Sequence, residues 1–178
     1  MTEIKDLRDF ISALDSDGQL VKVSNPVSIE YELADVAASI AREGKGACLF
    51  ENVTESPWPV FCGGVASHSR AAVALGCELS EVADTMENAL DPSNGVSPIR
   101  TDKADWQDNT ISGSEIDLKN LPILTHSRGD SGPFITGAVT VSKDPISGRG
   151  NLSYNRMSKL DKNILGFNVN EWLSLIHI

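Results

Sequence analysis

The chain has 178 residues, a formal net charge of -10 and a hydrophobic fraction of 40%. These values exclude a wholly disordered, collagenous or coiled-coil chain and predict one globular domain or slightly more. The acidic balance argues against nucleic acid as a partner, since nucleic-acid binding needs a basic face. The sequence contains neither an apolar run long enough to span a membrane nor a secretory signal, so we expect a cytoplasmic protein.

The first 90 residues predict helices that alternate with strands. Apolar residues at helical spacing predict a helix near residues 7–14, and Gly18 ends it. A strand at residues 20–23 precedes a second helix, for which Ser28 is the expected N-cap and Gly44 an end signal. Strands at 47–53 and 60–65 and short helices at 69–75 and 80–90 complete a mixed α/β unit.

The composition changes at residue 91. Residues 91–116 are rich in Asp, Asn, Ser, Gly and Pro, which predicts a linker or a surface excursion. A second unit begins at residue 117. Residues 134–141 have the strongest strand pattern of the chain, turn residues follow at 144–150, and residues 151–157 are extended again. This order predicts a β-hairpin with a long loop.

Several familiar kinds of catalytic site find little support. The histidines are His68, His126 and His177, and no two share a helical turn, so a zinc site is not expected. The Gly-Asp-Ser-Gly segment at 129–132 also occurs around the nucleophile of trypsin-like proteases, but the chain is too short for that fold, and a glycine-rich turn is favoured. The three cysteines, without a CxxC pair, indicate free thiols in a reducing compartment.

The second strand of the hairpin carries an unusual row of polar residues. In an extended strand Asn151, Ser153 and Asn155 share one face, where β-branched residues would be usual. Their oxygens suit Mg²⁺, Mn²⁺ or contacts to a phosphate. Arg156 suits a planar carboxylate, but it lies on the other face and can join Asn151 only if the strand bends. A solvated polar edge strand is the alternative interpretation.

Several short motifs occur in one order along nearly the whole chain. They are Leu7-Arg8-Asp9-Phe10-Ile11, Gly18-Gln19-Leu20-Val21, Leu49-Phe50-Glu51-Asn52-Val53, Leu118-x-x-Leu121-Pro122, Gly132-Pro133-Phe134-Ile135-Thr136-Gly137, Asp144-Pro145-x-x-Gly148, Asn151-x-Ser153-x-x-Arg156-Met157 and Asp161-Lys162-Asn163. In these segments the sequence resembles the UbiD-type decarboxylases, which use prenylated FMN.

The resemblance implies an α+β fold. An N-terminal α/β domain is expected over residues 1–90, a linker at 91–116, and the first strands of a flavin reductase-like split β-barrel at 117–172, with the barrel incomplete. Members of the family are much longer, so the chain is expected to be an N-terminal fragment. The tail at 173–178 has no family counterpart and resembles a translated sequencing adapter, and we expect it to be non-native.

The resemblance also implies an activity. The family carries out reversible, non-oxidative decarboxylation of aromatic, heteroaromatic or α,β-unsaturated carboxylic acids. Asn151 would ligate a divalent metal, Mn²⁺, with K⁺ as a further candidate ion, and this metal would hold the cofactor phosphate. Thr136, Ser153 and Tyr154 would line the prenylated FMN. Arg156 would be the catalytic residue and would contact both the cofactor and the substrate carboxylate.

The remaining metal ligands and the catalytic glutamates of the family have no counterpart in this chain. We therefore expect the 178-residue chain alone to be inactive, and the full-length protein to be a homo-oligomer that acts on a small-molecule carboxylic acid. The alternative is a non-catalytic module that binds a flavin or a partner. Tight binding of prenylated FMN and Mn²⁺ by the chain alone would favour that alternative.

Overall fold

Helices and short, separate sheets make up this α+β chain, of which the computed structural model describes residues 4–97 and 99–167. The chain divides into two units. The first takes in the residues up to Asn25, Val36–Asn52 and Pro59–Ser112, and the second contains Pro26–Asp35, Val53–Trp58 and the residues from Gly113 onward. The predicted α+β class is confirmed, and in the described part of the chain the strands close no barrel. The predicted non-native tail at 173–178 lies outside the described residues.

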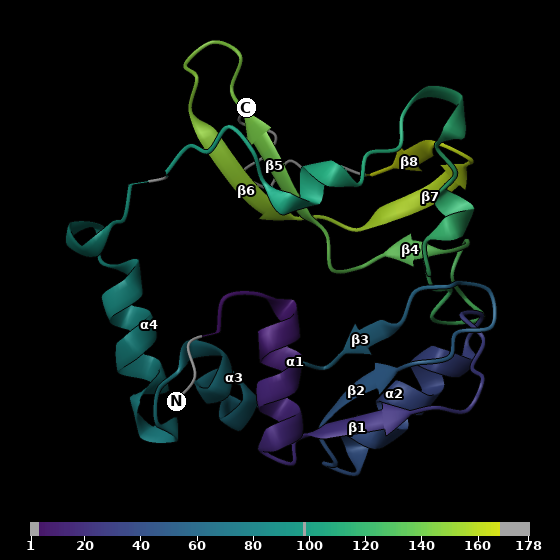
Figure 1. The fold of residues 1–178 in the computed structure, drawn as a ribbon, viewed down its shortest axis with the longest axis horizontal. Helices are drawn as coiled ribbons and strands as arrows, with labels where there is room; N and C mark the ends of the chain where they lie inside the picture. The colour runs from purple at the N-terminus through teal and green to yellow at the C-terminus, as the bar shows by residue number, and fades with distance from the viewer. Residues whose placement is uncertain (1–3, 98, 168–178) are drawn as a thin grey trace. The chain divides into compact units, whose positions relative to one another are not determined.

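The first unit contains a three-stranded sheet with the order β1-β2-β3 (Figure 1). Strand β1 (Leu20–Val23) pairs in parallel with β2 (Ala47–Phe50), which pairs antiparallel with β3 (Val60–Cys62). Parallel strands need a crossover connection, and helix α2 (Glu32–Arg42) lies in it. The strands that the sequence predicts at these three places are confirmed, the second and third being shorter than predicted.

Three further helices of the first unit pack in series. Helix α3 (His68–Leu75) contacts both α1 (Leu7–Ser16) and α4 (Val82–Leu90), as Figure 1 shows. The Asp6 carboxylate caps α1 by accepting hydrogen bonds from two backbone N–H groups of the first turn. Gly76 ends α3 in the left-handed region, with φ 66°. The helices that the sequence predicts near 7–14, at 69–75 and at 80–90 are confirmed.

The second helix begins later than predicted. Ser28 was the expected N-cap, but α2 begins at Glu32, because Tyr31 has a φ of 67° and interrupts a helical path. The Ser28 hydroxyl instead donates to the carboxylate of Glu55 at 2.5 Å. The backbone N–H of Tyr31 donates to the carbonyl of Thr125 at 2.9 Å. These partners are distant in sequence, so no local pattern could predict them.

The core of the first unit forms beside α1. Phe10, Leu14 and Ala47 are buried together, and the ring of Phe61 packs edge-on against Phe10 with ring centroids 6.1 Å apart. Leu14 and Phe50 are fully buried. In the second unit, buried apolar residues are Val27, Leu33, Val53 and Ile123.

The second unit contains two open sheets (Figure 1). Strand β7 (Met157–Asp161) pairs with both β4 (Phe134–Ile135) and β8 (Ile164–Gly166). Strands β5 (Val139–Lys143) and β6 (Gly150–Tyr154) form a hairpin. All of these pairings are antiparallel. The hairpin with a long loop that the sequence predicts is therefore confirmed.

The strand predicted over 134–141 is in fact two strands that belong to different sheets. Residues 136–138 separate β4 from β5, and Gly137 weakens strand structure there. Asn155 and Arg156 separate β6 from β7 in the same way. The two breaks lie side by side, because the backbone N–H of Asn155 donates to the carbonyl of Ala138 at 3.3 Å. The chain thus passes from one sheet to the other at two points that lie next to each other.

Leu14→Ala is expected to lower the free energy of unfolding by about 2–5 kcal/mol, because the fully buried side chain would leave a cavity. Leu7→Ala is the matched control: it removes the same atoms from the same helix, but Leu7 is 57% exposed, and the change should stay below about 0.5 kcal/mol. Urea unfolding of both variants measures the difference. Equal losses would contradict the placement of Leu14 in the core.

Gly46 allows the chain to approach the end of β1 closely. It has a φ of +126°, and a Cβ atom there would lie 2.4 Å from the carbonyl oxygen of Gln19. That oxygen accepts the backbone N–H of Ala47 at 2.8 Å. Gly46→Ala should therefore lower the free energy of unfolding by more than about 2 kcal/mol. Gly44→Ala, at φ +67° with nothing within 4 Å, should cost only about 1 kcal/mol. Thermal unfolding compares them, and the reverse ranking would refute the close approach.

Candidate functional site

The turn between β5 and β6 fixes the pairing of the hairpin. The backbone N–H of Asp144 donates to the carbonyl of Arg149 at 2.9 Å, and Gly148 donates to the carbonyl of Asp144 at 2.9 Å. Gly148 has a φ of +73°, which favours glycine. The hydroxyl of Ser147 and the backbone N–H of Ile146 donate to the Asp144 carboxylate, and these hydrogen bonds lower its pKa. This compact turn holds the two strands in one register.

The hairpin shields its polar residues and exposes its apolar ones. Ser142 lies opposite Asn151 and Thr140 opposite Ser153, and these four side chains share the less exposed face. The Ser153 hydroxyl donates to Oδ1 of Asn155 at 2.8 Å, and Asn155 is only 6% exposed. The predicted sharing of one face is confirmed for Asn151 and Ser153 within β6, while Asn155 lies just beyond the strand and is joined to Ser153 by this hydrogen bond.

The opposite face of the hairpin is apolar and open. Val141 is 78% exposed, Leu152 69% and Tyr154 77%. An antiparallel sheet with one open face usually covers its apolar side and leaves its polar side in water. Burial of apolar surface therefore does not explain which face of this hairpin is shielded.

Three polar atoms on the shielded face are buried without a hydrogen-bond partner. They are Oγ1 of Thr140, Oγ of Ser142 and Nδ2 of Asn151. Buried polar groups in native proteins are nearly always paired, and leaving one unpaired costs about 1–3 kcal/mol. Several unpaired atoms on facing positions of one hairpin require a specific explanation, and a bound group is one such explanation.

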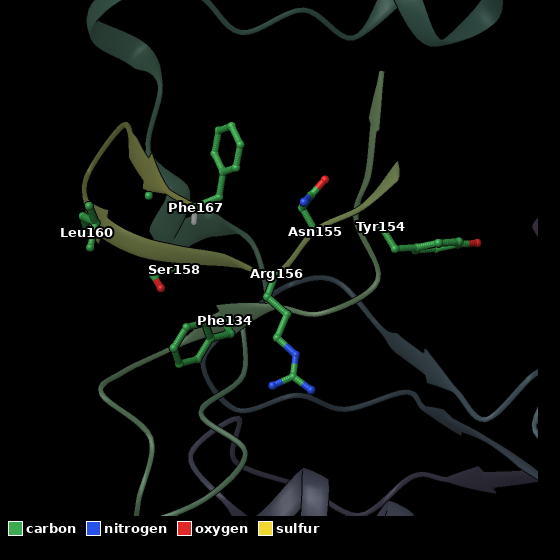
Figure 2. Close-up of a pocket in the computed structure, with 8 residues that line it drawn as sticks. Phe134, Tyr154, Asn155, Arg156, Ser158, Leu160 and Phe167 are labelled. Carbon is green, nitrogen blue, oxygen red and sulfur yellow. The ribbon is translucent and has the colours of Figure 1, made fainter. Parts of the chain in front are cut away.

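A pocket of about 470 Å³ lies where the chain leaves β6 for β7 (Figure 2). Figure 2 shows Asn155 and Arg156 pointing to opposite sides of the backbone. The apolar wall is formed by Phe134, Leu160 and Phe167, and the polar and amphipathic part by Tyr154, Asn155 and Arg156. The pocket thus combines an aromatic wall with a cation.

Arg156 stands in the break between the two sheets. Strand β6 ends at Tyr154 and Met157 begins β7, so the strand does not run straight through Arg156. The sequence analysis expected that Arg156 could approach Asn151 only if the strand bends, and the break lies at this point. Arg156 is exposed, and its guanidinium has no hydrogen bond or ion pair within residues 4–97 and 99–167. The guanidinium is therefore open to a ligand.

The predicted site residues fall into two groups along β4 to β7. Tyr154 and Arg156 line the pocket. Asn151 and Ser153 lie on the shielded face of β6 and do not line the pocket. Thr136 is exposed in the bend between β4 and β5.

Asn155 joins the site from the polar row that the sequence indicated, and Thr140 and Ser142 join it without having been singled out. Asn155 lines the pocket and is buried, and its place in the polar row was the available signal. Thr140 and Ser142 were missed because β5 alternates ordinary apolar and hydroxyl residues, a pattern that normally buries the valines. Only the pairing register places these two hydroxyls beside Asn151.

Other kinds of chemistry have little support in the described residues. Cys48 and Cys62 face each other across β2 and β3, but burial raises the pKa of Cys62 to about 12 and also raises that of Cys48. Thiolate is the reactive form of cysteine, so neither is an activated nucleophile. Among residues 4–97 and 99–167, no group of His, Cys, Asp and Glu side chains could by itself hold a metal ion. None of the helices described is long and apolar enough to cross a membrane.

Comparison with protein families identifies two consecutive domains. Residues 11–90 match the 3-octaprenyl-4-hydroxybenzoate carboxy-lyase N-terminal domain. Residues 97–174 match the Rift-related domain of the same UbiD carboxy-lyase. Both matches are to one family and follow each other in its domain order.

Solved structures of UbiD-class enzymes are similar to this chain over nearly its whole length. HmfF from Pelotomaculum thermopropionicum, in complex with FMN, is 29% identical with a TM-score of 0.83, and the match covers 96% of this chain and 38% of HmfF. An evolved dimeric form of HmfF, in complex with prFMN, is 27% identical with a TM-score of 0.79, and the match covers 93% of this chain and 38% of that form of HmfF.

Two further decarboxylases extend the comparison. The apo 3,4-dihydroxybenzoic acid decarboxylase of Klebsiella pneumoniae is 25% identical with a TM-score of 0.80, covering 98% of this chain and 38% of the enzyme. The vanillic acid decarboxylase of Sedimentibacter hydroxybenzoicus, in its closed form, is 23% identical with a TM-score of 0.87, covering 99% and 40%, and shows the fold alone.

The chain spans 38–40% of the length of these enzymes. The family match takes in both units of the fold, including the hairpin and the pocket beside it. Because two successive domains of one family account for residues 11–90 and 97–174, the chain belongs to the UbiD carboxy-lyase family.

Proposed function

We propose that this chain supplies the flavin-binding and carboxylate-binding part of a prenylated-FMN-dependent carboxy-lyase. The reaction is the reversible, non-oxidative decarboxylation of an aromatic, heteroaromatic or α,β-unsaturated carboxylic acid. The observation that carries the proposal is the unpaired Arg156 beside an aromatic pocket, close in the chain to the unpaired amide of Asn151. Membership of the UbiD family and the prFMN complex of HmfF support it.

Arg156 is proposed to bind the substrate carboxylate. A guanidinium presents a planar array of donors that matches both oxygens of a carboxylate, which orients the acid as well as attracting it. Phe134 and Phe167 offer an apolar wall against which a flat, unsaturated acid would pack. Excluding water from this wall would strengthen the ion pair, because charges interact more strongly at low dielectric.

The shielded face of β6 fits the phosphate end of a flavin. The Nδ2 of Asn151 is a buried donor without a partner, and a phosphate oxygen is an acceptor that would complete it. Thr136, Ser153 and Tyr154 would line the flavin from the bend before β5 and the end of β6. Prenylated FMN, when bound, would supply the electron sink for the electron pair that CO₂ leaves on an sp² carbon.

The fit to a metal is partial. The amide oxygen of Asn151 is a ligand that Mn²⁺ accepts, and K⁺ is a further candidate ion. One neutral ligand does not hold a divalent ion, so the other ligands would come from the part of the relatives' length that this chain does not span. For the same reason we infer that the 178-residue chain alone is inactive.

For the whole protein, we infer a cytoplasmic homo-oligomer that acts on small carboxylic acids and does not bind nucleic acid. The net charge of -10 supports the last point for this 178-residue part of the protein, because phosphate backbones repel an acidic surface. The dimeric form of HmfF supports an assembly of identical subunits. Aromatic acids such as 3,4-dihydroxybenzoic acid are the first substrates to test, given the Klebsiella pneumoniae relative.

Arg156→Ala in the full-length gene product, loaded with prenylated FMN and Mn²⁺, should lower kcat/KM for decarboxylation by about 10²–10³-fold, because the carboxylate loses its charged partner. Arg156→Lys keeps the charge but not the paired donors, and should also lose most of the activity. Arg149→Ala is the matched control, since it removes an exposed arginine from the hairpin turn and should leave activity within about threefold. Release of CO₂ from a panel of aromatic and unsaturated acids is measured.

Full activity of Arg156→Ala would remove Arg156 from the proposed mechanism. A wild-type protein that binds the flavin but decarboxylates no acid of the panel would instead support a non-catalytic flavin-binding module. Flavin absorbance of each variant, recorded beside the rates, separates loss of chemistry from loss of cofactor.

A further inference from the structure

Two of the three cysteines lie opposite each other in the sheet of the first unit. Cys48 in β2 pairs with Cys62 in β3, the antiparallel strand at the edge of the sheet. The backbone N–H groups of Ala47 and Glu51 donate to carbonyls on the side of β1, at 2.8 and 3.0 Å. Since successive residues of a strand direct their backbone groups to opposite sides, Cys48 directs its own toward β3. The two cysteines are therefore a hydrogen-bonded pair, with Cα atoms about 5.5 Å apart.

This separation suits a disulfide bond. The Cα atoms that a disulfide joins are most often about 5.5–6 Å apart. The Cβ atoms of opposed residues, at about 4.5–5.5 Å, would have to approach to about 3.5–4.5 Å. Strand β3 has only three residues, lies at the sheet edge and is followed by Gly63 and Gly64, so it can move toward β2. A bond that needs such movement is easily reduced again.

The two thiols already interact, and a buried cation lies beside them. Burial raises the pKa of both thiols, and a hydrogen bond from Cys62 lowers that of Cys48 in part. Arg70 is 8% exposed, and its Nε donates to the carbonyl of Gly63 at 2.9 Å. Its charge also lowers the pKa of Cys48. In the described part of the chain Arg70 has no ion pair, although a buried arginine usually has an anionic partner. The Cys48 thiolate would be such a partner.

We propose that Cys48 and Cys62 form a reversible disulfide by exchange with a small-molecule disulfide such as glutathione disulfide. The thiolate of Cys62, the more exposed of the two, attacks one sulfur of that molecule, whose S–S bond breaks and releases one thiolate. The thiolate of Cys48 then attacks the Cys62 sulfur and releases the second thiolate. Two protein thiols are thus oxidised by two electrons, the small disulfide is reduced to two thiols, and the two cysteine protons pass to them.

The raised pKa values make this exchange slow without deciding its end point. The rate depends on the fraction of thiolate, whereas the equilibrium depends on the stability of the disulfide. In a reducing compartment both thiols stay free, as they are in this structure, and the disulfide accumulates when small-molecule disulfides do. Both cysteines belong to the first unit and neither lines the pocket, so the inference does not depend on the proposed function.

Peptide mapping by mass spectrometry tests the pairing in the folded 178-residue protein. The reduced protein is incubated with excess glutathione disulfide, quenched with acid, alkylated and digested. We expect one internal disulfide, between Cys48 and Cys62, that dithiothreitol removes. Cys77→Ser is the matched control, because it deletes the third thiol and should leave the yield of this disulfide unchanged. Protein unfolded in urea before oxidation should give every pairing of the three cysteines, since the register is then lost.

Single variants separate the two steps. Cys48→Ser should stop at a stable mixed disulfide of glutathione on Cys62, because the second thiol is missing. Cys62→Ser should react about tenfold more slowly than Cys48→Ser, since Cys48 is only 3% exposed. Arg70→Gln should prolong the mixed disulfide about tenfold, because Cys48 loses the charge that favours its thiolate. Arg70→Lys keeps the charge and should leave that lifetime unchanged. Far-UV circular dichroism establishes that each variant is folded.

The proposal is overturned if the folded protein keeps Cys48 and Cys62 as thiols, or as separate mixed disulfides, in excess glutathione disulfide. It is also overturned if Cys77 pairs with either of them as often as they pair with each other, because the register would then not direct the reaction. An unchanged lifetime of the mixed disulfide in Arg70→Gln would contradict the part given to Arg70. If that variant does not fold, the maps of the wild type and of Cys77→Ser still decide the pairing.

Discussion

The antiparallel pairing of β5 with β6 decides where every residue of the candidate site lies. A slip of one residue would turn each side chain of a strand to the other face, because successive residues of a strand alternate. Asn151 would then leave the shielded face, and the break that carries Arg156 would lose its place beside Ala138. The Asp144 turn, which binds no ligand in the proposed mechanism, is therefore the part of the hairpin on which the site depends.

The shielded face of this hairpin lowers the free energy of unfolding of the ligand-free protein. Polar atoms of Thr140, Ser142 and Asn151 are buried unpaired, while Val141 and Leu152 remain exposed on the other face. A segment selected for folding alone would have the opposite arrangement, with the valines inside. Conflicts of this kind between local pattern and structure are expected at functional sites, where binding groups are held ready at the expense of the ligand-free fold. In the described residues of the first unit, by contrast, the fully buried Leu14 and Phe50 are apolar.

Sequence reasoning succeeded where the signals were local. The periodicity of α1, the strand at β1 and the turn residues of the β5–β6 hairpin were all readable from neighbouring residues. It failed at Ser28, whose hydroxyl bonds to Glu55 across the chain, and at residues 136–138, where one apparent strand divides between two sheets. Thr140 and Ser142 needed the register with β6 before they could be recognised. The roles of Asn151 and Arg156 came from family resemblance and stay predictions: the structure breaks the strand just before Arg156, and only Arg156 of the two lines the pocket.

The position of Arg156 just beyond the end of β6 also limits how such a site can evolve. Asn151 lies within β6 and Arg156 lies just beyond its end. The number of residues between them therefore determines which face of the strand carries Asn151 and in which direction the Arg156 side chain points. An insertion or deletion in this stretch would disturb both at once, and no substitution elsewhere in the strand could restore them separately. Substitutions between these two residues and in the pocket wall can therefore accumulate during evolution. Insertions and deletions between the two residues are far less compatible with the site.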